Sequence, residues 1–417
     1  MKIQLAKGTK DIRPEEKIKR DYIINILKNV FERYGFVPLE TPILERYETL
    51  SAKFAAGQES DALRETFKLN DQGNRKLGLR YDLTVPLARF VAMNKDLAMP
   101  FKRYQIDKAF RDGPIERGRV REFWQCDVDI VGVKSMKGDA EILNLVKDSF
   151  NALNLDVTLK VSNRKILDGI LDYLKIKDKE SVMTSIDKLY KIGIDEVKKE
   201  LKDKKVNDNQ IKELVKIISF KGSNNEKIES LNFLKNNPGI NELKELMNYF
   251  DDFEFDLTLV RGLSYYTGTV FEAVLKNKEL RCSVAGGGRY DKMIGKFMNK
   301  KEDDEIGAVG IAFGLEPISD VFKFDKKSNV KLYCIPINAY KESLKIVNEL
   351  RKNAINTDID LNDRNISKNL DYANKKGIPF VLIIGENELK LGKYKLKNMA
   401  DGREEFLTKE ELINKLK

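Results

Sequence analysis

Apolar residues near the start of the chain recur at the spacing of a helix, and further on they alternate as in strands. Four of them lie four positions apart and mark one helical face: Ile18, Tyr22, Ile26 and Val30. Pro14 suits the first turn of a helix, and Gly35 suits its end. These signals together predict a helix over residues 14–34.

Prolines then interrupt the pattern. The stretch FVPLETPILER at residues 36–46 contains Pro38 and Pro42, which exclude a helix and restrict any strand to an edge or an interface. Residues 77–92 begin with a strand pattern, and we expect them to continue as a helix after Pro86.

Residues 100–132 contain two strand-like runs around a polar loop from Arg111 to Arg121, which is typical of a long hairpin with a basic tip. On the second run three polar residues share one face: Gln125, Asp127 and Asp129. Burying them without partners would be costly, and a polar-lined pocket relieves that cost. The alternative is an edge strand with a wet face, which is disfavoured because the opposite face is continuous and apolar: Cys126, Val128 and Ile130.

Phe123 and Trp124 are neighbours on the same run, so their side chains point to opposite faces of the strand. One of them could stack on a nucleobase while the other joins the core. Taken singly, an aromatic residue on a strand is more often a core residue.

The middle of the chain contains both helical and strand patterns. Asp139 is expected to cap an amphipathic helix whose apolar face is Ile142, Leu143, Val146, Phe150 and Leu153. Residues 163–250 are rich in Lys, Glu, Asn and Leu at helical spacing, and they predict a helical insertion. Strand patterns stand on both sides of it, at residues 157–161, 253–260, 270–275, 281–288 and 308–314, the last leading into a helix.

Beyond a linker at Lys326–Ser328 the elements alternate regularly. Strands are predicted at residues 331–337, 358–361 and 379–385, and helices at 340–353 and 367–376. Alternation of this kind is typical of a small α/β domain with a largely parallel sheet.

Composition limits the number of domains and the class of protein that this chain can form. The chain has 417 residues, of which 41% are hydrophobic, enough for two or three domains of about 150 residues each. No apolar run approaches the roughly 20 residues of a membrane span, and no signal-peptide pattern precedes the first helix. Three dispersed cysteines fit no zinc or redox motif and favour a cytosolic setting: Cys126, Cys282 and Cys334.

The charge and the absence of one residue type bear on the chemistry. The net charge of +10 is compatible with a polyanionic partner such as RNA, although the lysines are dispersed and a simple basic surface is the alternative. The chain has no histidine, which excludes Ser-His-Asp and Cys-His catalysis and all histidine metal ligands. Catalysis must therefore depend on carboxylates, arginines, lysines, tyrosines, backbone amides or an oxygen-held metal.

Several residues could bind an anionic or amino ligand. Arg111, followed by Arg117 and Arg119 at the hairpin tip, suits phosphate recognition, with a solvated basic loop as the alternative. Arg261 follows a strand and could stabilise developing negative charge, or be a surface residue beside a glycine turn. Asp82 and Thr84 could hold an amine by charge and by hydroxyl.

Taken together, these segments resemble one family. TPILER resembles motif 1 of class II aminoacyl-tRNA synthetases, and FRDGPIERGRVREFWQCDVDIVG resembles motif 2 of the histidyl enzymes, especially their archaeal and eukaryotic branch. LVRGLSYYTGTVFE and AGGGRYD resemble the two histidine-specific signatures, and AVGIAFGLEP resembles motif 3. The resemblance implies an α/β protein with three parts: an antiparallel-sheet catalytic core over residues 1–325, the helical insertion 163–250 within it, and a C-terminal α/β anticodon-binding domain over 329–417.

The resemblance also implies roles for matching residues. Arg111 would bind the ATP α-phosphate, Phe123 would stack on adenine, and Arg261 would stabilise the α-phosphate during adenylate formation. Three residues would hold the α-amino group of histidine: Asp82, Thr84 and Gln125. Three more would surround its imidazole: Asp129, Tyr265 and Tyr266. The expected substrates are L-histidine, ATP with Mg²⁺ and tRNA(His), and no protein side chains are assigned to a metal. A cytoplasmic homodimer without membrane association is expected.

Two positions depart from the family pattern. Pro317 stands where motif 3 has an arginine that contacts ATP, so another cation is expected there or ATP binding is weaker. Arg289 is a hypothetical replacement. Ser264 stands where the family commonly has aspartate, and the effect should be smaller.

Two alternatives compete with a histidine-activating enzyme. One is the synthetase-like regulatory subunit of ATP phosphoribosyltransferase, which generally lacks the anticodon domain and has an eroded motif 2, both of which are present here. The other is a synthetase for threonine or proline. The threonyl enzyme's zinc site needs histidine and cysteine ligands that this chain lacks.

Overall fold

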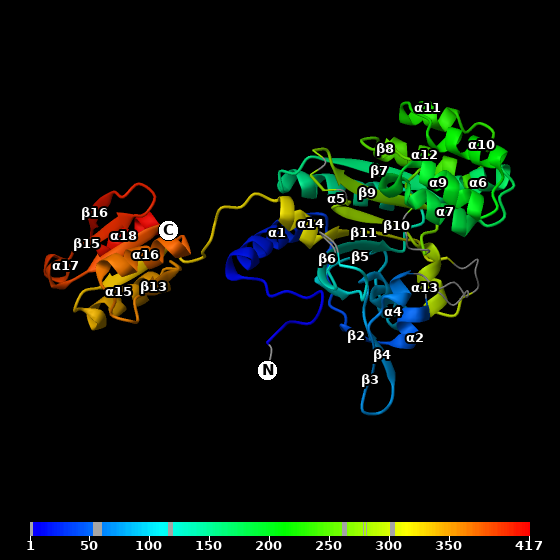
Figure 1. Ribbon diagram of the computed structural model, residues 1–417. Helices are drawn as coiled ribbons and strands as arrows, with labels where there is room; N and C mark the ends of the chain where they lie inside the picture. The colour runs from blue at the N-terminus through cyan, green and yellow to red at the C-terminus, as the bar shows by residue number, and fades with distance from the viewer. Residues whose placement is uncertain are drawn as a thin grey trace. The chain divides into compact units, whose positions relative to one another are not determined.

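The computed structural model describes residues 3–52, 61–115, 120–260, 265–277, 279–280, 282–300 and 305–417. The chain divides into two compact units, one formed by residues 1–10 and 23–322 and the other by residues 11–22 and 323–417. Each unit is built around its own sheet (Figure 1).

The sheet of the larger unit has the strand order β1-β5-β6-β11-β10-β9-β7-β8. In that order the strands span Val37–Pro38, Phe101–Phe110, Glu122–Val131, Ala308–Gly314, Ala285–Arg289, Thr269–Leu275, Val157–Asn163 and Glu254–Phe255. Pairing is antiparallel except at the two ends, where β1 lies parallel to β5 and β8 parallel to β7. The antiparallel core implied by the resemblance is therefore confirmed.

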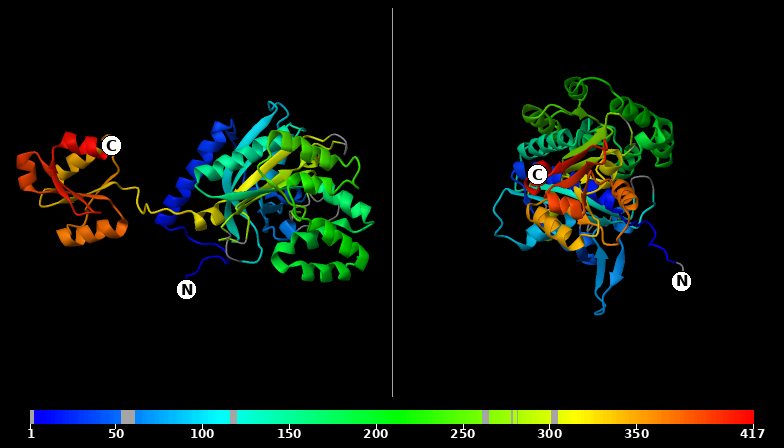
Figure 2. Two further views of the ribbon diagram at one scale, coloured as in Figure 1. Left: turned by 90° about the horizontal axis from the view of Figure 1, so that it is seen from above. Right: turned by 90° about the vertical axis from the view of Figure 1, so that its left-hand side faces the viewer.

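One face of this sheet packs against α5 (Lys137–Ala152) and against the part of α1 (Pro14–Arg33) that begins at Ile23. Cys126, Val128 and Ile130 of β6 lie in that core with Ile311 and Phe313 of β11. The other face carries a smaller apolar cluster, contributed mainly by α4 (Thr84–Met93) and α13 (Asp291–Phe297). A three-stranded sheet joins α4 on this side, in the order β2 (Leu44–Arg46), β4 (Lys76–Leu79) and β3 (Lys68–Asn70), and its β3–β4 hairpin projects outward (Figure 2).

Several predictions about these elements are confirmed, and one alternative is wrong. The helix expected at 14–34 is α1, and the hairpin expected at 100–132 is β5 and β6. Because β6 lies between β5 and β11, the alternative of an edge strand is wrong. Pro38 does lie in an edge strand, as proline requires.

Three local predictions need correction. The helix expected after Pro86 begins at Thr84, because proline is tolerated in a first turn, where its missing N–H has no helical partner. Asp139 does not cap α5: Met136 is the N-cap residue, and Asp139 is buried inside the first turn. The strand expected over 253–260 ends at Phe255, because the Asp256 carboxylate accepts hydrogen bonds from the backbone N (2.9 Å) and hydroxyl (2.6 Å) of Thr258, forming a turn.

The segment between β7 and β8 is helical, as its periodicity predicts. Helices α6 to α12 span Arg164–Tyr173, Lys179–Asp187, Leu189–Ile192, Ile194–Asp203, Asp208–Ile218, Asn224–Glu229 and Pro238–Tyr249. Side-chain caps define the start of most of them: Asn163, Asp178, Asn207, Ser223 and Asn237.

The smaller unit has a five-stranded sheet in the order β13 (Thr357–Ile359), β12 (Leu332–Pro336), β14 (Phe380–Ile384), β15 (Tyr394–Asn398) and β16 (Glu404–Leu407). Alternate residues of β12 pack on opposite faces of the sheet. Leu332 and Cys334 pack on one face with α15 (Tyr340–Lys352) and α18 (Lys409–Leu416). Tyr333 and Ile335 pack on the other face with α16 (Ile366–Lys376), and α17 (Glu386–Leu391) joins β14 to β15.

The prediction of a largely parallel sheet holds for only part of this unit. Strands β13, β12 and β14 are parallel, whereas β15 and β16 pair antiparallel. The last two strands were missed because YKLKN and EEFL are short and charged and lack an apolar run. No helix in the described parts of the chain is both long and apolar enough to span a membrane.

Candidate active site

The candidate site lies on the side of the large sheet to which Gln125, Asp127 and Asp129 belong, which we call the polar face. Across β5 and β11, Asp129 is paired with Arg103 and Gly310, and Asp127 with Gln105 and Ala312. Strand β11 thus contributes only small residues beside the aspartates. Asp127 and Asp129 are each only 2% exposed.

Asp129 is held from two sides. Arg103, which is fully buried, forms an ion pair of 2.8 Å with one carboxylate oxygen, and the Tyr290 hydroxyl donates to the other at 2.5 Å. The carboxylate lies directly over Gly310, where a Cβ atom would stand 1.9 Å from Asp129 Oδ1. Glycine is therefore required at this place because any side chain would displace the aspartate.

The segment that leads into α4 approaches the polar face. Arg103 donates to the backbone oxygen of Leu83 (3.0 Å), and Arg111 Nε donates to that of Tyr81 (3.1 Å). Asp82, 2% exposed, accepts from the Val85 backbone N at 3.0 Å in the first turn of α4. Two arginines of β5 and its end therefore fix the backbone that carries Asp82.

Two tyrosines complete the surroundings. The centroids of the Tyr265 and Tyr266 rings lie 4.6 Å apart. The Tyr265 and Tyr290 rings are nearly perpendicular, with 6.0 Å between their centroids. Tyr266 lies against Gly288, where a Cβ atom would stand 2.9 Å from its Cδ1. Burial raises the pKa of the Tyr265 hydroxyl well above its ordinary value, and its neighbours include Asp82 and Thr84.

The buried carboxyl groups of the polar face repel one another. Burial raises the pKa of Asp127 well above its ordinary value, with further increases from the negative charges of Asp129 and Asp82, although Arg103 opposes them. Burial also raises the pKa of Asp129, against the attraction of Arg103 and the hydrogen bond from Tyr290. A cationic ligand would relieve the repulsion among these carboxyl groups.

The aromatic pair on β6 separates as the alternation predicts. Trp124 packs against the main core, while Phe123 lies on the polar side beneath the Arg111 guanidinium, 5.2 Å from ring centroid to Cζ. Glu316, at the start of α14 (Leu315–Val321), accepts from the backbone N of Trp124 at 3.1 Å. The neighbouring Pro317 is buried and supplies no charge.

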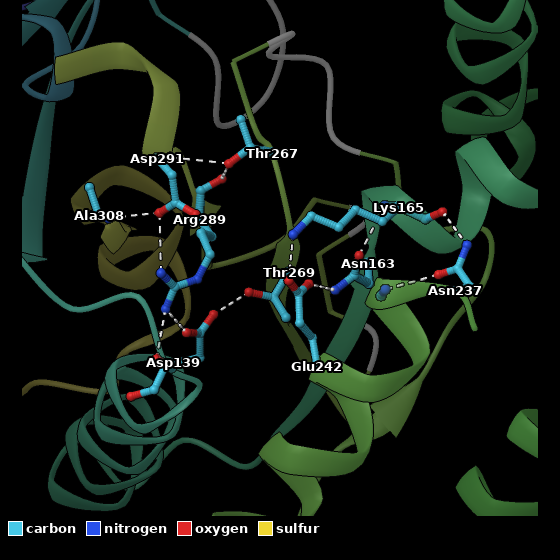
Figure 3. A network of polar contacts seen from close by, with 12 residues as sticks. Asp139, Asn163, Lys165, Asn237, Glu242, Thr267, Thr269, Arg289, Asp291 and Ala308 are labelled. Atoms are coloured by element: carbon cyan, nitrogen blue, oxygen red, sulfur yellow. Dashed lines mark hydrogen bonds and ion pairs between the residues drawn. The ribbon is translucent and has the colours of Figure 1, made fainter. Parts of the chain in front are cut away.

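Arg289 cannot act as the substitute cation that we hypothesised, because its side chain lies on the opposite side of the sheet. It forms ion pairs with Asp139 and, at 3.1 Å, with Asp291, and Asp139 also accepts from the Thr269 hydroxyl (Figure 3). Its guanidinium also donates to two backbone oxygens, those of Val133 (2.8 Å) and Ser135 (3.0 Å). At 1% exposure, Arg289 is a structural residue.

The structure brings most of the predicted residues together. Asp82, Asp129, Tyr265 and Tyr266 are linked by contacts or by electrostatic interaction, Thr84 reaches Tyr265, and Gln125 shares the polar face with Asp127. Arg111 and Phe123 lie together at the hairpin end. Arg261 and Ser264 lie outside the described residues, as do Arg117 and Arg119.

Sequence reasoning missed two residues of the site. Arg103 could have been found, because it stands on a strand that pairs with the polar run and its positive charge suits a buried aspartate. Tyr290 gave no such signal, because it lies 161 positions from Asp129 and meets it only through β10 and α13.

An antiparallel sheet whose polar face carries basic, acidic and aromatic side chains, within a chain that has a separate α/β unit, is the architecture of a class II aminoacyl-tRNA synthetase. The family model for histidyl-tRNA synthetase matches residues 8–318, and that for the anticodon-binding domain matches residues 331–417. The chain belongs to the histidyl-tRNA synthetase family.

Similar proteins agree with this assignment. Histidine–tRNA ligase 1 of Bacillus cereus is 42% identical, with 97% of each chain covered, and the histidine–tRNA ligase of Clostridium tetani is 37% identical over 100% of this chain and 98% of its own. The crystal structure of histidyl-tRNA synthetase from Nostoc sp. PCC 7120 superposes with a TM-score of 0.84 at 30% identity, covering 100% of this chain and 99% of that one. A Bacillus halodurans protein described as an ATP phosphoribosyltransferase regulatory subunit/histidyl-tRNA synthetase shares the fold at 22% identity, with a TM-score of 0.74, covering 92% of this chain and 99% of that one.

Proposed function

We propose that this protein is a histidine–tRNA ligase, which activates L-histidine with ATP and transfers it to the 3′ end of tRNA(His). The observation that carries the proposal is the buried polar face, where Asp129 is oriented by Arg103 and Tyr290 beside two further tyrosines. An oriented, buried carboxylate between aromatic rings suits a small planar ring with N–H donors, and imidazole is such a ring.

Recognition of the amino acid divides between two ends of the polar face. Asp82, Thr84 and Gln125 hold the α-amino group, because a carboxylate, a hydroxyl and an amide oxygen are all hydrogen-bond acceptors that suit its N–H groups. Asp129 and Tyr266 bind the imidazole, and Tyr265 lines the same space. Two observations support this division. The negative charge of Asp82 raises the pKa of Asp129, and the rings of Tyr265 and Tyr266 are in contact.

ATP binds at the hairpin end of β5 and β6. Arg111 neutralises the α-phosphate, and Phe123 stacks on adenine on the same side of the strand. Arg261 stabilises the charge that develops on the α-phosphate, a role taken from the family motif. The histidine carboxylate attacks the α-phosphorus and pyrophosphate leaves. The terminal tRNA hydroxyl then attacks the carbonyl carbon and AMP leaves, so positioning and charge neutralisation perform both steps.

Mg²⁺ accompanies ATP as part of the substrate. Among the described residues no group of three or more Asp, Glu or Cys side chains is placed to hold a metal ion. Phosphate oxygens and water are the ligands that Mg²⁺ commonly keeps when it binds with a nucleotide.

The remaining assignments follow the family. We propose a catalytic domain over residues 1–325, an insertion over 163–250 and an anticodon-binding domain over 329–417. The basic net charge of +10 supports binding of tRNA. We also propose a cytoplasmic homodimer.

Histidine-dependent exchange of pyrophosphate into ATP tests the proposal. The purified chain should catalyse exchange with histidine and with no other amino acid in a panel that includes threonine and proline. Absence of exchange, together with binding to an ATP phosphoribosyltransferase catalytic subunit, would instead identify a regulatory subunit.

A further inference from the structure

One buried carboxyl group on the polar face has no assigned task. Asp127 lies between Gln125 and Asp129 on β6 and is 2% exposed. Its Oδ1 atom is fully buried and has no hydrogen-bond partner within the described residues. A carboxylate in this condition loses its hydration without compensation, so native structures rarely keep one unless a ligand or another group completes it.

The neighbouring carboxylates on the same side of the sheet are already compensated. Asp129 is bound by Arg103 and Tyr290, and Asp107 of β5 forms a 2.7 Å ion pair with the fully buried Arg80. The charges of Arg103 and Arg111 lower the pKa of Asp127, but neither forms an ion pair with it. Arg103 pairs with Asp129 and donates to the backbone of Leu83, and Arg111 donates to the backbone of Tyr81. Asp127 is therefore the carboxyl group on this face that lacks a bound cation among the described residues.

The surroundings of Asp127 indicate what kind of group it would accept. On the neighbouring strand β11 it is paired with Ala312, whose methyl group offers no polar contact. Asp82 is close enough to raise the pKa of Asp127 by repulsion between the two negative charges. Two carboxyl groups that repel each other in a buried place favour a small cation that can bridge them with several N–H donors, and an ammonium group fits that description.

We propose that Asp127 is a substrate-binding residue that accepts a hydrogen bond from the α-ammonium group of histidine and, with Asp82, neutralises its positive charge. The proposal rests on the function proposed above, because it needs histidine to occupy the polar face. It adds a carboxylate from β6 to the one that lies just before α4, beside Thr84 and Gln125. Asp129 remains the carboxylate for the imidazole.

Ligands that keep or lack the ammonium group, compared in the wild-type protein and in the variants, separate this role from others. Histidinol and histamine keep both the imidazole and the ammonium group, whereas 3-(imidazol-4-yl)propionate keeps the imidazole and the carboxylate but has no ammonium group. Dissociation constants are measured by calorimetry for the wild-type protein and for Asp127→Asn, which preserves volume. Asp139→Asn is the matched control, because Asp139 is equally buried but lies on the opposite side of the sheet.

Asp127→Asn should raise the dissociation constants of histidinol and histamine by about 10-fold to 100-fold, the range expected for a hydrogen bond to a charged group. It should not weaken the binding of imidazolepropionate, because an anionic ligand binds more favourably once a nearby negative charge is removed. In pyrophosphate exchange the KM for histidine should rise while the KM for ATP stays constant. Asp139→Asn should leave the affinities of histidinol and histamine relative to that of imidazolepropionate unchanged.

Equal weakening of all three ligands would show that Asp127 acts on the imidazole or only on the structure, and would overturn the proposal. Unchanged affinities in Asp127→Asn would overturn it as well. If that variant does not fold, the same ligand series with Asp127→Ser, which is smaller and uncharged, gives the comparison. Wild-type exchange with histidine is measured first, so a failure of the proposed function is seen separately from a failure of this inference.

Discussion

The buried ion pair between Arg289 and Asp139 should stabilise the larger unit strongly. Replacing Asp139 by Asn removes a negative charge that is fully buried and keeps the shape of the side chain. Arg289 would then retain Asp291 and two backbone oxygens as partners, but its charge would be compensated only in part.

The size of the effect follows from those contacts. Removing one partner of a buried ion pair costs about 3–5 kcal/mol, and the surviving contact with Asp291 places this case near the lower limit. We therefore expect Asp139→Asn to lower the free energy of unfolding by about 3 kcal/mol. Replacing both partners by apolar residues, Asp139→Leu with Arg289→Met, should restore at least half of the loss, because no charge is then left buried alone.

Urea denaturation followed by tryptophan fluorescence measures this change in the right part of the molecule. The chain has a single tryptophan, Trp124, which packs in the core of the larger unit, so unfolding of the smaller unit does not enter the signal. Asp156→Asn is the control, because Asp156 pairs with Lys276 at 2.8 Å on the surface of the same unit, with 76% of its side chain exposed. The reasoning is refuted if Asp139→Asn shifts the midpoint no further than this control does.

Three further variants test other parts of the argument. Gly310→Ala should raise the KM for histidine at least about tenfold without changing that for ATP, because its Cβ would stand 1.9 Å from Asp129 Oδ1; an unchanged KM would show that Asp129 does not bind substrate. Phe123→Ala should raise the KM for ATP about tenfold, the lower end of base-stacking energies, whereas Phe123→Tyr should not. Burial raises the pKa of Asp291 to about 6, so the folded state binds the extra proton between pH 3.8 and about 6 and stability falls as pH rises through that window. The stability of Asp291→Asn relative to wild type should therefore rise across the same window, by at most about 1.4 kcal/mol per pH unit, and a flat difference in urea denaturation would contradict this.

Local elements of the fold were predictable where periodicity is strong. The spacing of Ile18 to Val30 predicted α1, and the alternation on β6 predicted which of its residues face the core. Elements with weak or competing signals were missed or misplaced. Asp139 matches the pattern of a cap, but an arginine far away in sequence draws it into a buried ion pair. The antiparallel β15 and β16 lack the apolar run that marks a buried strand.

The sequence by itself determined the chemistry that this protein can use and the family to which it belongs. The absence of histidine and the motifs around Arg111 and Tyr266 point to charge neutralisation without a histidine base. Sequence order also decides which residues of one strand share a face, because the side-chain period of a strand is two.

Only the tertiary structure decided which distant residues contact and orient those site residues. Arg103 and Tyr290 reach Asp129 from different elements, and Gly310 makes room for it. Pairing of β5, β6, β11 and β10 brings together positions as distant in the chain as Gln125 and Gly314. The same pairing places Arg289 on the far side of the sheet and leaves Asp127 buried on the near side with Oδ1 unbonded among the described residues. Long-range strand register fixes these contacts, and no local pattern encodes the register between strands so distant in the chain.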